Sequence, residues 1–215
     1  MIKAIIFDFD GVIAESVSVK TEAFAEIYRP YGNNLEQKVV EHHLANGGIS
    51  RFEKFRLYHN EFLGVDLTES ELADLADQFS YLVLDKVIAA PYVQGAYEFL
   101  SEYHHVYDFF ISTGTPESEI VSILEEKQLM RFFRKVYGSP EKKTEHVSRI
   151  LRNGNYQSNE VVFVGDSPSD CDAARKNNIP FIARVVEGNS QLKDEERIIP
   201  NLQGLGTTIA KLFDL

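Results

Sequence analysis

Short apolar runs alternate with longer amphipathic segments along the chain after residue 91. Short segments suited to strands lie at 106–111, 135–137, 161–164, 181–184 and 198–199, and one more, the apolar run 2–7, begins the chain. Between them, the spacing predicts helices at 94–103, 117–128, 141–152, 169–177 and 205–215, with a polar loop at 188–197. Strands that alternate with helices indicate an α/β fold, a Rossmann-like parallel sheet with helices on both faces.

The segment between the first strand and residue 91 has a different pattern, because no strand-like run interrupts it. Its apolar spacing predicts four amphipathic helices, at 17–28, 35–44, 49–63 and 69–87, separated by prolines and glycines. We therefore expect an inserted, all-helical cap domain at 16–87. The α/β core domain would consist of residues 1–15 and 88–215.

The composition narrows the classes of partner. The chain carries 22 basic and 33 acidic residues, a net charge of -11, which disfavours nucleic acid and anionic membranes as partners. A small anionic substrate remains possible, because it needs only a few local cations. With one cysteine, no internal disulfide can form. No apolar run approaches the roughly 20 residues that span a bilayer, so we expect a soluble, cytoplasmic protein.

Two carboxylates follow the first predicted strand, in the run Asp8-Phe9-Asp10-Gly11. Positions i and i+2 after an extended run project to the same side, so the two anions repel each other unless a cation offsets them. Mg²⁺ takes oxygen ligands and leaves room for water and phosphate in its shell. The alternative is a solvated, Asp-rich turn. Ligands of such sheets bind beyond the carboxyl ends of the strands, which is where this run lies.

Two further strand ends carry polar groups. The strand at 106–111 runs into Ser112, Thr113, Gly114 and Thr115, which could bind an anion ahead of a helix, or Thr115 could simply cap a helix that starts at residue 116. The strand at 161–164 runs into Gly165 and Asp166. An acid in that position is costly unless it is solvated, hydrogen-bonded or metal-bound, and we interpret Asp166 as a metal ligand.

Lysines and a second acid flank these strand ends. Asp170 lies near the start of the helix after Asp166, where it could cap that helix or complement its dipole. Lys142 and Lys143 lie between the second and third strand ends, near the start of a predicted helix. Lysines there oppose the helix dipole, but a cation is needed where phosphate and several carboxylates share one site.

In this order, the motifs resemble the haloacid dehalogenase-like superfamily, in particular its branch of phosphoglycolate phosphatases and β-phosphoglucomutases. The resemblance rests on residues 8–12, Thr113, Lys143 after Gly-Ser-Pro at 138–140, and residues 165–170. It covers the core from residue 2 to about 184, and the helical insertion lies where this family has its cap. Ser112 could replace Thr113, and Lys142 could replace Lys143. Many relatives have Asp-Ser where this chain has Glu15-Ser16.

The resemblance implies a Mg²⁺-dependent phosphatase acting on a small phosphomonoester. Asp8 would be the nucleophile that forms an aspartyl-phosphate, and Asp10 the general acid and base. Thr113 would donate a hydrogen bond to the phosphoryl group and Lys143 would balance its charge. Gly114 would lie beside the substrate. The expected ligands of Mg²⁺ are the Asp8 carboxylate, the Asp10 carbonyl and Asp166, with Asp170 in a supporting role.

In the predicted cap, Gly48-Ile49-Ser50-Arg51 is similar to a cap loop of the β-phosphoglucomutase-like members. Ser50 is a fair N-cap for the helix that follows. Arg51 is the better candidate to reach an anionic substrate, whereas Lys54 is interpreted as a solvated surface residue. His42 and His43 are interpreted as surface or packing residues.

Two alternatives to a phosphatase remain open at this stage. A sugar-phosphate mutase would use the same Asp8 and Asp10 but return the phosphoryl group to the substrate instead of water. A non-catalytic binding protein would have kept the fold but lost a catalytic group, whereas every motif position is filled. The sequence identifies neither the substrate nor the oligomeric state.

Overall fold

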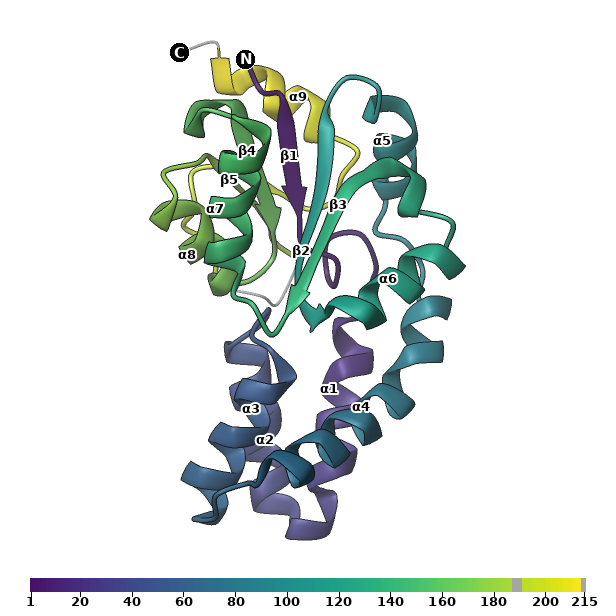
Figure 1. Ribbon diagram of the computed structural model, residues 1–215, viewed down its shortest axis with the longest axis vertical. Helices are drawn as coiled ribbons and strands as arrows, with labels where there is room; N and C mark the ends of the chain where they lie inside the picture. Colours follow the sequence, from purple (N-terminus) through teal and green to yellow (C-terminus); the bar gives the residue numbers. More distant parts are fainter. Residues whose placement is uncertain (187–190, 214–215) are drawn as a thin grey trace.

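The computed structural model describes residues 1–186 and 191–213, and in it a mixed α/β unit lies above a group of helices (Figure 1). Parts of two predicted elements, residues 187–190 at the start of the polar loop and residues 214–215 of the last helix, lie outside the described residues. Over the described residues, six parallel strands form one sheet in the order β3-β2-β1-β4-β5-β6. The strands are β1 (Ala4–Phe7), β2 (Asp108–Pro116), β3 (Phe133–Ser139), β4 (Val161–Gly165), β5 (Phe181–Arg184) and β6 (Ile198–Ile199).

The register of the three central strands brings their carboxyl ends to the same level. Phe7 of β1 is paired with Ile111 of β2 and with Val164 of β4. The residues that follow these positions therefore meet at one edge of the sheet. This edge faces the helical group in the lower half of Figure 1.

Helices cover both faces of the sheet, as the alternating strands and helices predicted. In β1, Ile5 and Phe7 belong to one apolar cluster, whereas Ala4 and Ile6 belong to the other. The first cluster includes side chains of α5 (Ala96–Tyr103), α6 (Glu117–Glu126) and α9 (Leu205–Ala210), and the second includes side chains of α7 (Lys143–Gly154) and α8 (Pro168–Lys176). Successive strand residues point to opposite faces, so this fully apolar strand is buried on both sides.

The inserted segment is helical throughout, as expected. It contains α1 (Val17–Tyr28), α2 (Asn33–Ala45), α3 (Arg51–Leu57) and α4 (Glu69–Ala89), and α3 continues as a π-helical turn, Tyr58–Leu63. The rings of Phe24, Phe55 and Phe79 join α1, α3 and α4 in its core, with centroids 4.5–6.0 Å apart. The exact division of the chain at 16–87 stays a prediction.

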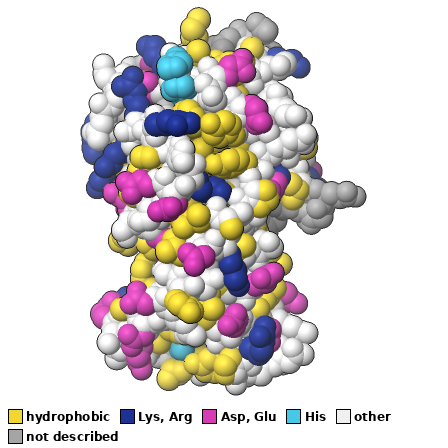
Figure 2. Space-filling model, turned by 90° about the vertical axis from the view of Figure 1, so that its right-hand side faces the viewer, with side chains coloured by type: hydrophobic (Ala, Val, Ile, Leu, Met, Phe, Trp, Pro, Cys, Tyr) yellow, Lys and Arg dark blue, Asp and Glu magenta, His cyan; other side chains and the backbone are white. Residues whose placement is uncertain are grey.

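The space-filling view shows a waist between the α/β unit and the helical cap, with acidic side chains on both parts of the visible face (Figure 2). None of the described helices has both the length and the apolar character that a membrane span requires.

The second strand end differs from the expectation. We predicted that Thr115 could cap a helix starting at Pro116, but β2 continues through Pro116, whose partner in β3 is Ser139. The helix α6 begins only at Glu117 and receives no side-chain cap. The continued pairing with β3 keeps Thr115 in the strand, so the capping interpretation is wrong. By contrast, Ser50 does cap α3, since its hydroxyl accepts a hydrogen bond from the Phe52 amide.

Candidate active site

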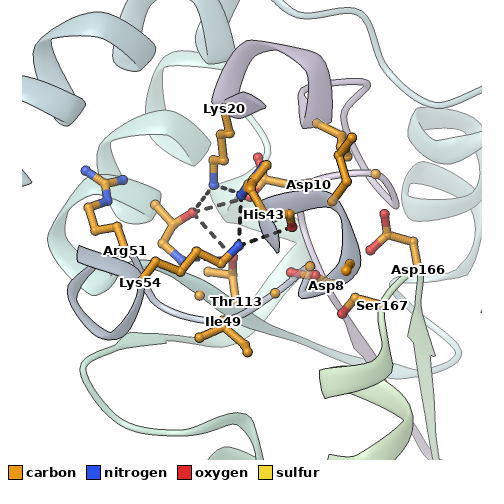
Figure 3. Close-up of a pocket in the computed structure, with 18 of the residues that line it drawn as sticks. Asp8, Asp10, Lys20, His43, Ile49, Arg51, Lys54, Thr113, Asp166 and Ser167 are labelled. Carbon is orange, nitrogen blue, oxygen red and sulfur yellow. Dashed lines mark hydrogen bonds and ion pairs between the residues drawn. The ribbon is translucent and has the colours of Figure 1, made fainter. Parts of the chain in front are cut away.

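A cavity of about 650 Å³ lies between the carboxyl ends of the strands and the cap (Figure 3). Core residues on its wall include Asp8, Asp10, Thr113, Gly114 and Asp166, which come from the loops after β1 and β4 and from the end of β2. Cap residues complete it, among them Lys20, Phe24, His43, Arg51, Lys54 and Phe79. The predicted strand-end residues therefore share one cavity.

Lys143 lies between two carboxylates. Its Nζ is 2.7 Å from Asp8 and 2.7 Å from Asp170, and all three side chains are buried. Lys142 is exposed and precedes α7. Of the two lysines considered from sequence, Lys143 is thus the one that reaches the strand ends.

The carboxylate of Asp170 has two functions in the structure. Besides Lys143, it accepts hydrogen bonds from the amide and hydroxyl of Ser167, at 3.1 and 2.6 Å. These bonds form a capping box at the start of α8. The same carboxylate therefore takes part in the capping box of α8 and accepts a hydrogen bond from Lys143.

The surroundings of Asp8 and Asp166 disfavour the ionised forms of both carboxyl groups. Burial raises the pKa of Asp8 to about 7, against the lowering effect of Lys143, while Asp170 and Asp10 add to the rise. Burial also raises the pKa of Asp166, to which the charges of Asp8 and Asp170 contribute. Within the described residues, no hydrogen-bond donor reaches the Asp166 carboxylate. A cation between these acids would offset this repulsion.

The Asp10 carboxylate has different partners. Ser16 donates to it at 2.6 Å, Lys20 forms an ion pair with it, and Thr115 donates at 3.3 Å. Burial alone would raise the pKa of Asp10, but Lys20, Ser16 and more distant Lys143 together lower it. The two aspartates of the first motif therefore have opposite pKa shifts.

Sequence reasoning missed Lys20. It lies in the first turn of α1, where a lysine opposes the helix dipole, which is the signal that drew attention to Lys142 and Lys143. Applied at α1, the same signal would have found it. The amine also donates to Thr115 at 2.6 Å, so a cap residue joins the ends of β1 and β2.

The hydroxyls after β2 point in different directions. The Ser112 hydroxyl is fully buried, 2.9 Å from Nδ1 of His146 in α7. Thr113 lines the cavity, as does Gly114. Of the two candidates for the second motif, Thr113 is therefore the one that lines the cavity.

Gly48 and Gly114 bring the cap loop close to the strand ends. A Cβ on Gly114 would lie 2.6 Å from the carbonyl oxygen of Gly48. A Cβ on Gly48, whose φ is +72°, would lie 2.2 Å from the Ser169 hydroxyl and 2.8 Å from the Lys143 amine. A larger residue at either position would push the cap loop away, so the two glycines permit closure over the site.

Arg51 lines the cavity, but its guanidinium is engaged by Glu119 of α6. The two groups form a buried, bidentate pair, with Nη1 2.9 Å from Oε2. The Ser80 hydroxyl is 2.6 Å from each of them. Arg51 would have to leave this pair to reach a substrate anion, and its position joins the cap to the core.

The interpretation of Lys54 as a solvated surface residue is wrong. Its side chain is 2% exposed, and its amine lies 2.8 Å from Nδ1 of His43 (Figure 3). Helical spacing put Lys54 on a face adjacent to Arg51, but could not show that this face turns toward the cavity. His43 is a buried packing residue, as expected, and it also holds this amine.

Glu15, which departs from the usual Asp-Ser pattern, pairs with Arg184 at the end of β5, 2.6 Å away. Arg184 also donates to the carbonyl of Gly11, at 2.7 Å. This arginine, which sequence reasoning did not select, fixes the loop that carries Asp10.

The acidic groups fit a hard divalent cation. Carboxylate oxygens of Asp8, Asp166 and Asp170 lie within 4.8 Å of one another. Of these three, Asp8 and Asp166 line the cavity, whereas Asp170 is fully buried and bonded to Lys143 and Ser167, so Asp8 and Asp166 are the carboxylates best placed for Mg²⁺. The side chain of Asp10 lies outside this group, so only its backbone could serve, as the family resemblance implies.

Residues 5–184 match the haloacid dehalogenase-like hydrolase family, and the chain belongs to that family of enzymes. The chain is 27% identical to a phosphoglycolate phosphatase of Pseudomonas syringae pv. tomato, over 96% of this chain and 82% of that protein. A second phosphoglycolate phosphatase, from Pseudomonas savastanoi pv. phaseolicola, is also 27% identical, over 84% and 68%. In fold, the chain is similar to a β-phosphoglucomutase from Clostridium difficile, with a TM-score of 0.80, 18% identity and coverage of 100% and 98%.

Proposed function

We propose that this enzyme is a Mg²⁺-dependent phosphatase that hydrolyses a small phosphomonoester through an aspartyl-phosphate on Asp8. The observation that carries the proposal is the contrast between two aspartates of one loop. Asp8 lies with Lys143 beside Asp166, whereas Asp10 is held by Ser16 and Lys20 on the cap side. Such a pair can divide the work of nucleophile and proton carrier. The phosphatase names of the relatives support the same activity.

In the first half of the reaction, an oxygen of Asp8 attacks phosphorus, and the bond to the ester oxygen breaks. Lys143 and the Phe9 amide, 2.7 Å from Oδ2 and Oδ1, hold the attacking carboxylate in place. Asp10 gives its proton to the departing oxygen. A bound phosphate would oppose the ionised form of Asp10 by like-charge repulsion, and so would favour the protonated form needed here.

In the second half, water attacks the phosphorus of the aspartyl-phosphate and releases inorganic phosphate and Asp8. Asp10 accepts the proton of that water. Lys20 and Ser16 lower the pKa of Asp10, so the carboxylate is ready to act as this base. Asp10 can serve in both halves, because the proton that it gives to the ester oxygen is replaced by the proton that it takes from water.

The remaining groups would bind the phosphoryl oxygens. The Thr113 hydroxyl and the amide of Gly114 are the proposed donors at the end of β2. Mg²⁺, held by Asp8, Asp166 and the Asp10 carbonyl, would neutralise charge on the transferring group. Asp170 supports the site through Lys143.

A phosphoryl mutase on the same scaffold is the second candidate. The close fit of Gly48 against Ser169 and Lys143 favours it, because a mutase must keep water from the aspartyl-phosphate. The engagement of Arg51 by Glu119 speaks against it, since this arginine would be the natural partner of a second phosphate. Accumulation of inorganic phosphate distinguishes the two activities.

The test is release of inorganic phosphate from a panel of small phosphomonoesters, with Mg²⁺ and with EDTA. Release by the wild type that requires Mg²⁺ and disappears in Asp8→Asn supports the phosphatase. Isomerised sugar phosphate without free phosphate would support the mutase instead. Release that persists in Asp8→Asn contradicts both candidates.

A further inference from the structure

The amine of Lys54 is buried in the cap wall of the cavity. The side chain comes from α3, and its Nζ lies 2.8 Å from Nδ1 of His43 and 5.5 Å from the centre of the Phe24 ring. In its charged form the lysine can only donate, so His43 then accepts this hydrogen bond through Nδ1. Burial keeps His43 neutral by lowering its pKa to about 2, with a further contribution from Lys54. The amine is thus held in place by a neutral partner.

Lys54 differs from the other cations that line the cavity. Lys20 pairs with Asp10, Arg51 with Glu119, and Arg184 with Glu15. In the part of the chain that the structure describes, no carboxylate forms an ion pair with Lys54. A buried cation without an anion is costly, and such a group on a cavity wall is suited to an anion that the protein does not supply.

We propose that Lys54, positioned by His43, binds a carboxylate at the end of the substrate away from the phosphate. The substrate would then be a small phosphorylated hydroxy acid. This inference rests on the proposed phosphatase function and narrows its substrate class. Phosphoglycolate, the compound in the names of the relatives, belongs to this class.

The surroundings of the amine favour a carboxylate over a second phosphate. A single ammonium group with apolar walls, Phe24 and Phe79, offers one charge and few further donors. The other cations on the cap wall are occupied, Lys20 by Asp10 and Arg51 by Glu119. One carboxylate matches one lysine in charge, whereas a phosphate dianion would remain only partly neutralised.

Binding to a protein that cannot turn over tests the proposal directly. In the Asp8→Asn background, calorimetry with Mg²⁺ compares 2-phosphoglycolate with its amide, and the phosphate ester of 3-hydroxypropanoate with its amide. Each pair differs only in the distal charge, and the two pairs differ in length. Lys54→Met removes the ammonium and keeps the length of the side chain. Lys38→Met removes an exposed cap lysine outside the cavity and is the matched control.

We expect at least one acid to bind roughly 10- to 100-fold more tightly than its amide, the range for one charged hydrogen bond. Lys54→Met should abolish that preference and leave amide binding within about threefold. Lys54→Arg should restore part of it, and Lys38→Met should retain all of it. A purely structural role of Lys54 would weaken acid and amide equally.

The proposal is overturned if acid and amide bind equally to the Asp8→Asn protein that retains Lys54, or if neither pair of compounds binds to it. A preference that survives Lys54→Met overturns it as well. Phosphate release by the wild type is measured separately. Because the binding assay needs no turnover, failure of the phosphatase function and failure of the Lys54 assignment give different results.

Discussion

The Lys143 amine lies 2.7 Å from the Asp8 carboxylate, although 135 positions separate the two residues in the sequence. Parallel strands bring the loop after β1 and the start of α7 to the same edge of the sheet. The pair is buried, so each member depends on the other to remain charged. The first prediction follows from this dependence.

Lys143→Met should abolish activity and destabilise the fold by about 3–5 kcal/mol near neutral pH, because it leaves Asp8 and Asp170 as unpaired buried acids. The variant raises the pKa of Asp8 further above its unfolded value. Since Asp8 already has a pKa of about 7 in the wild type, the part of the stability loss that comes from Asp8 should appear only as the pH rises above about 7. Urea unfolding in EDTA at several pH values measures it. Lys142→Met, on the exposed neighbour, should match the wild type; a pH-independent loss in Lys143→Met contradicts this account.

Asp166→Asn should remove the effect of Mg²⁺ on stability. In the wild type, Mg²⁺ should raise the melting temperature, since a ligand bound only by the folded state stabilises it. Without metal, the variant should melt above the wild type at pH 7–8, because burial, Asp8 and Asp170 raise the pKa of Asp166 and the ionised form costs stability. Asp172→Asn, an exposed change on α8, is the control. A full Mg²⁺ response in Asp166→Asn would refute this assignment.

The pair of Arg51 and Glu119 should behave as one unit between cap and core. Glu119→Gln leaves the buried guanidinium without its counter-ion, and we expect a loss of about 3 kcal/mol. Arg51→Met should cost a similar amount. The double variant should cost about as much as one single variant, because no unpaired charge remains. Denaturant titrations of the four proteins give the coupling, and strictly additive losses would show that the pair is not a unit.

Lys54→Met should stabilise the ligand-free protein. Burial lowers the pKa of Lys54 to about 7, with Lys20 and Lys143 adding to the effect, so the folded state binds this proton less tightly than the unfolded chain. The cost of the lysine should grow as the pH falls from about 10 toward 7 and should then level off. Thermal melts from pH 6 to 10 test this, with Lys38→Met as the control. A variant that melts below the wild type at every pH would indicate a structural role.

The sequence predicted the centre of the sheet well because β1 and β4 are continuous apolar runs. The strands at Phe181–Arg184 and Ile198–Ile199 were predicted with the observed bounds. The parallel arrangement then predicted that residues after β1, β2 and β4 would meet, and Asp8, Thr113 and Asp166 do line one cavity. The local pattern gave the ends of β1 and β4 to within one residue, and the parallel sheet brings the residues that follow them together.

The cap side of the site was harder to predict, because its contacts depend on how two groups of elements meet. The Arg51–Glu119 pair spans 68 positions, and no local pattern joins its members. The pattern within its own helix gave no sign that Lys54 is buried. Its burial comes from the packing of α3 over the cavity. The ion pair between Lys20 and Asp10 depends on how the chain turns between β1 and α1, and the sequence pattern does not show that geometry.

The most direct test of the account is to follow the phosphoryl group with 4-nitrophenyl phosphate in the presence of Mg²⁺. Its leaving group needs no proton, so Asp10→Asn should still form the aspartyl-phosphate but hydrolyse it slowly. We predict a burst of nitrophenolate equal to the enzyme concentration, and one phosphoryl group on the peptide that carries Asp8 after acid quenching. Asp8→Asn should show neither. A burst that survives Asp8→Asn, or a phosphoryl group on another residue, would contradict the account.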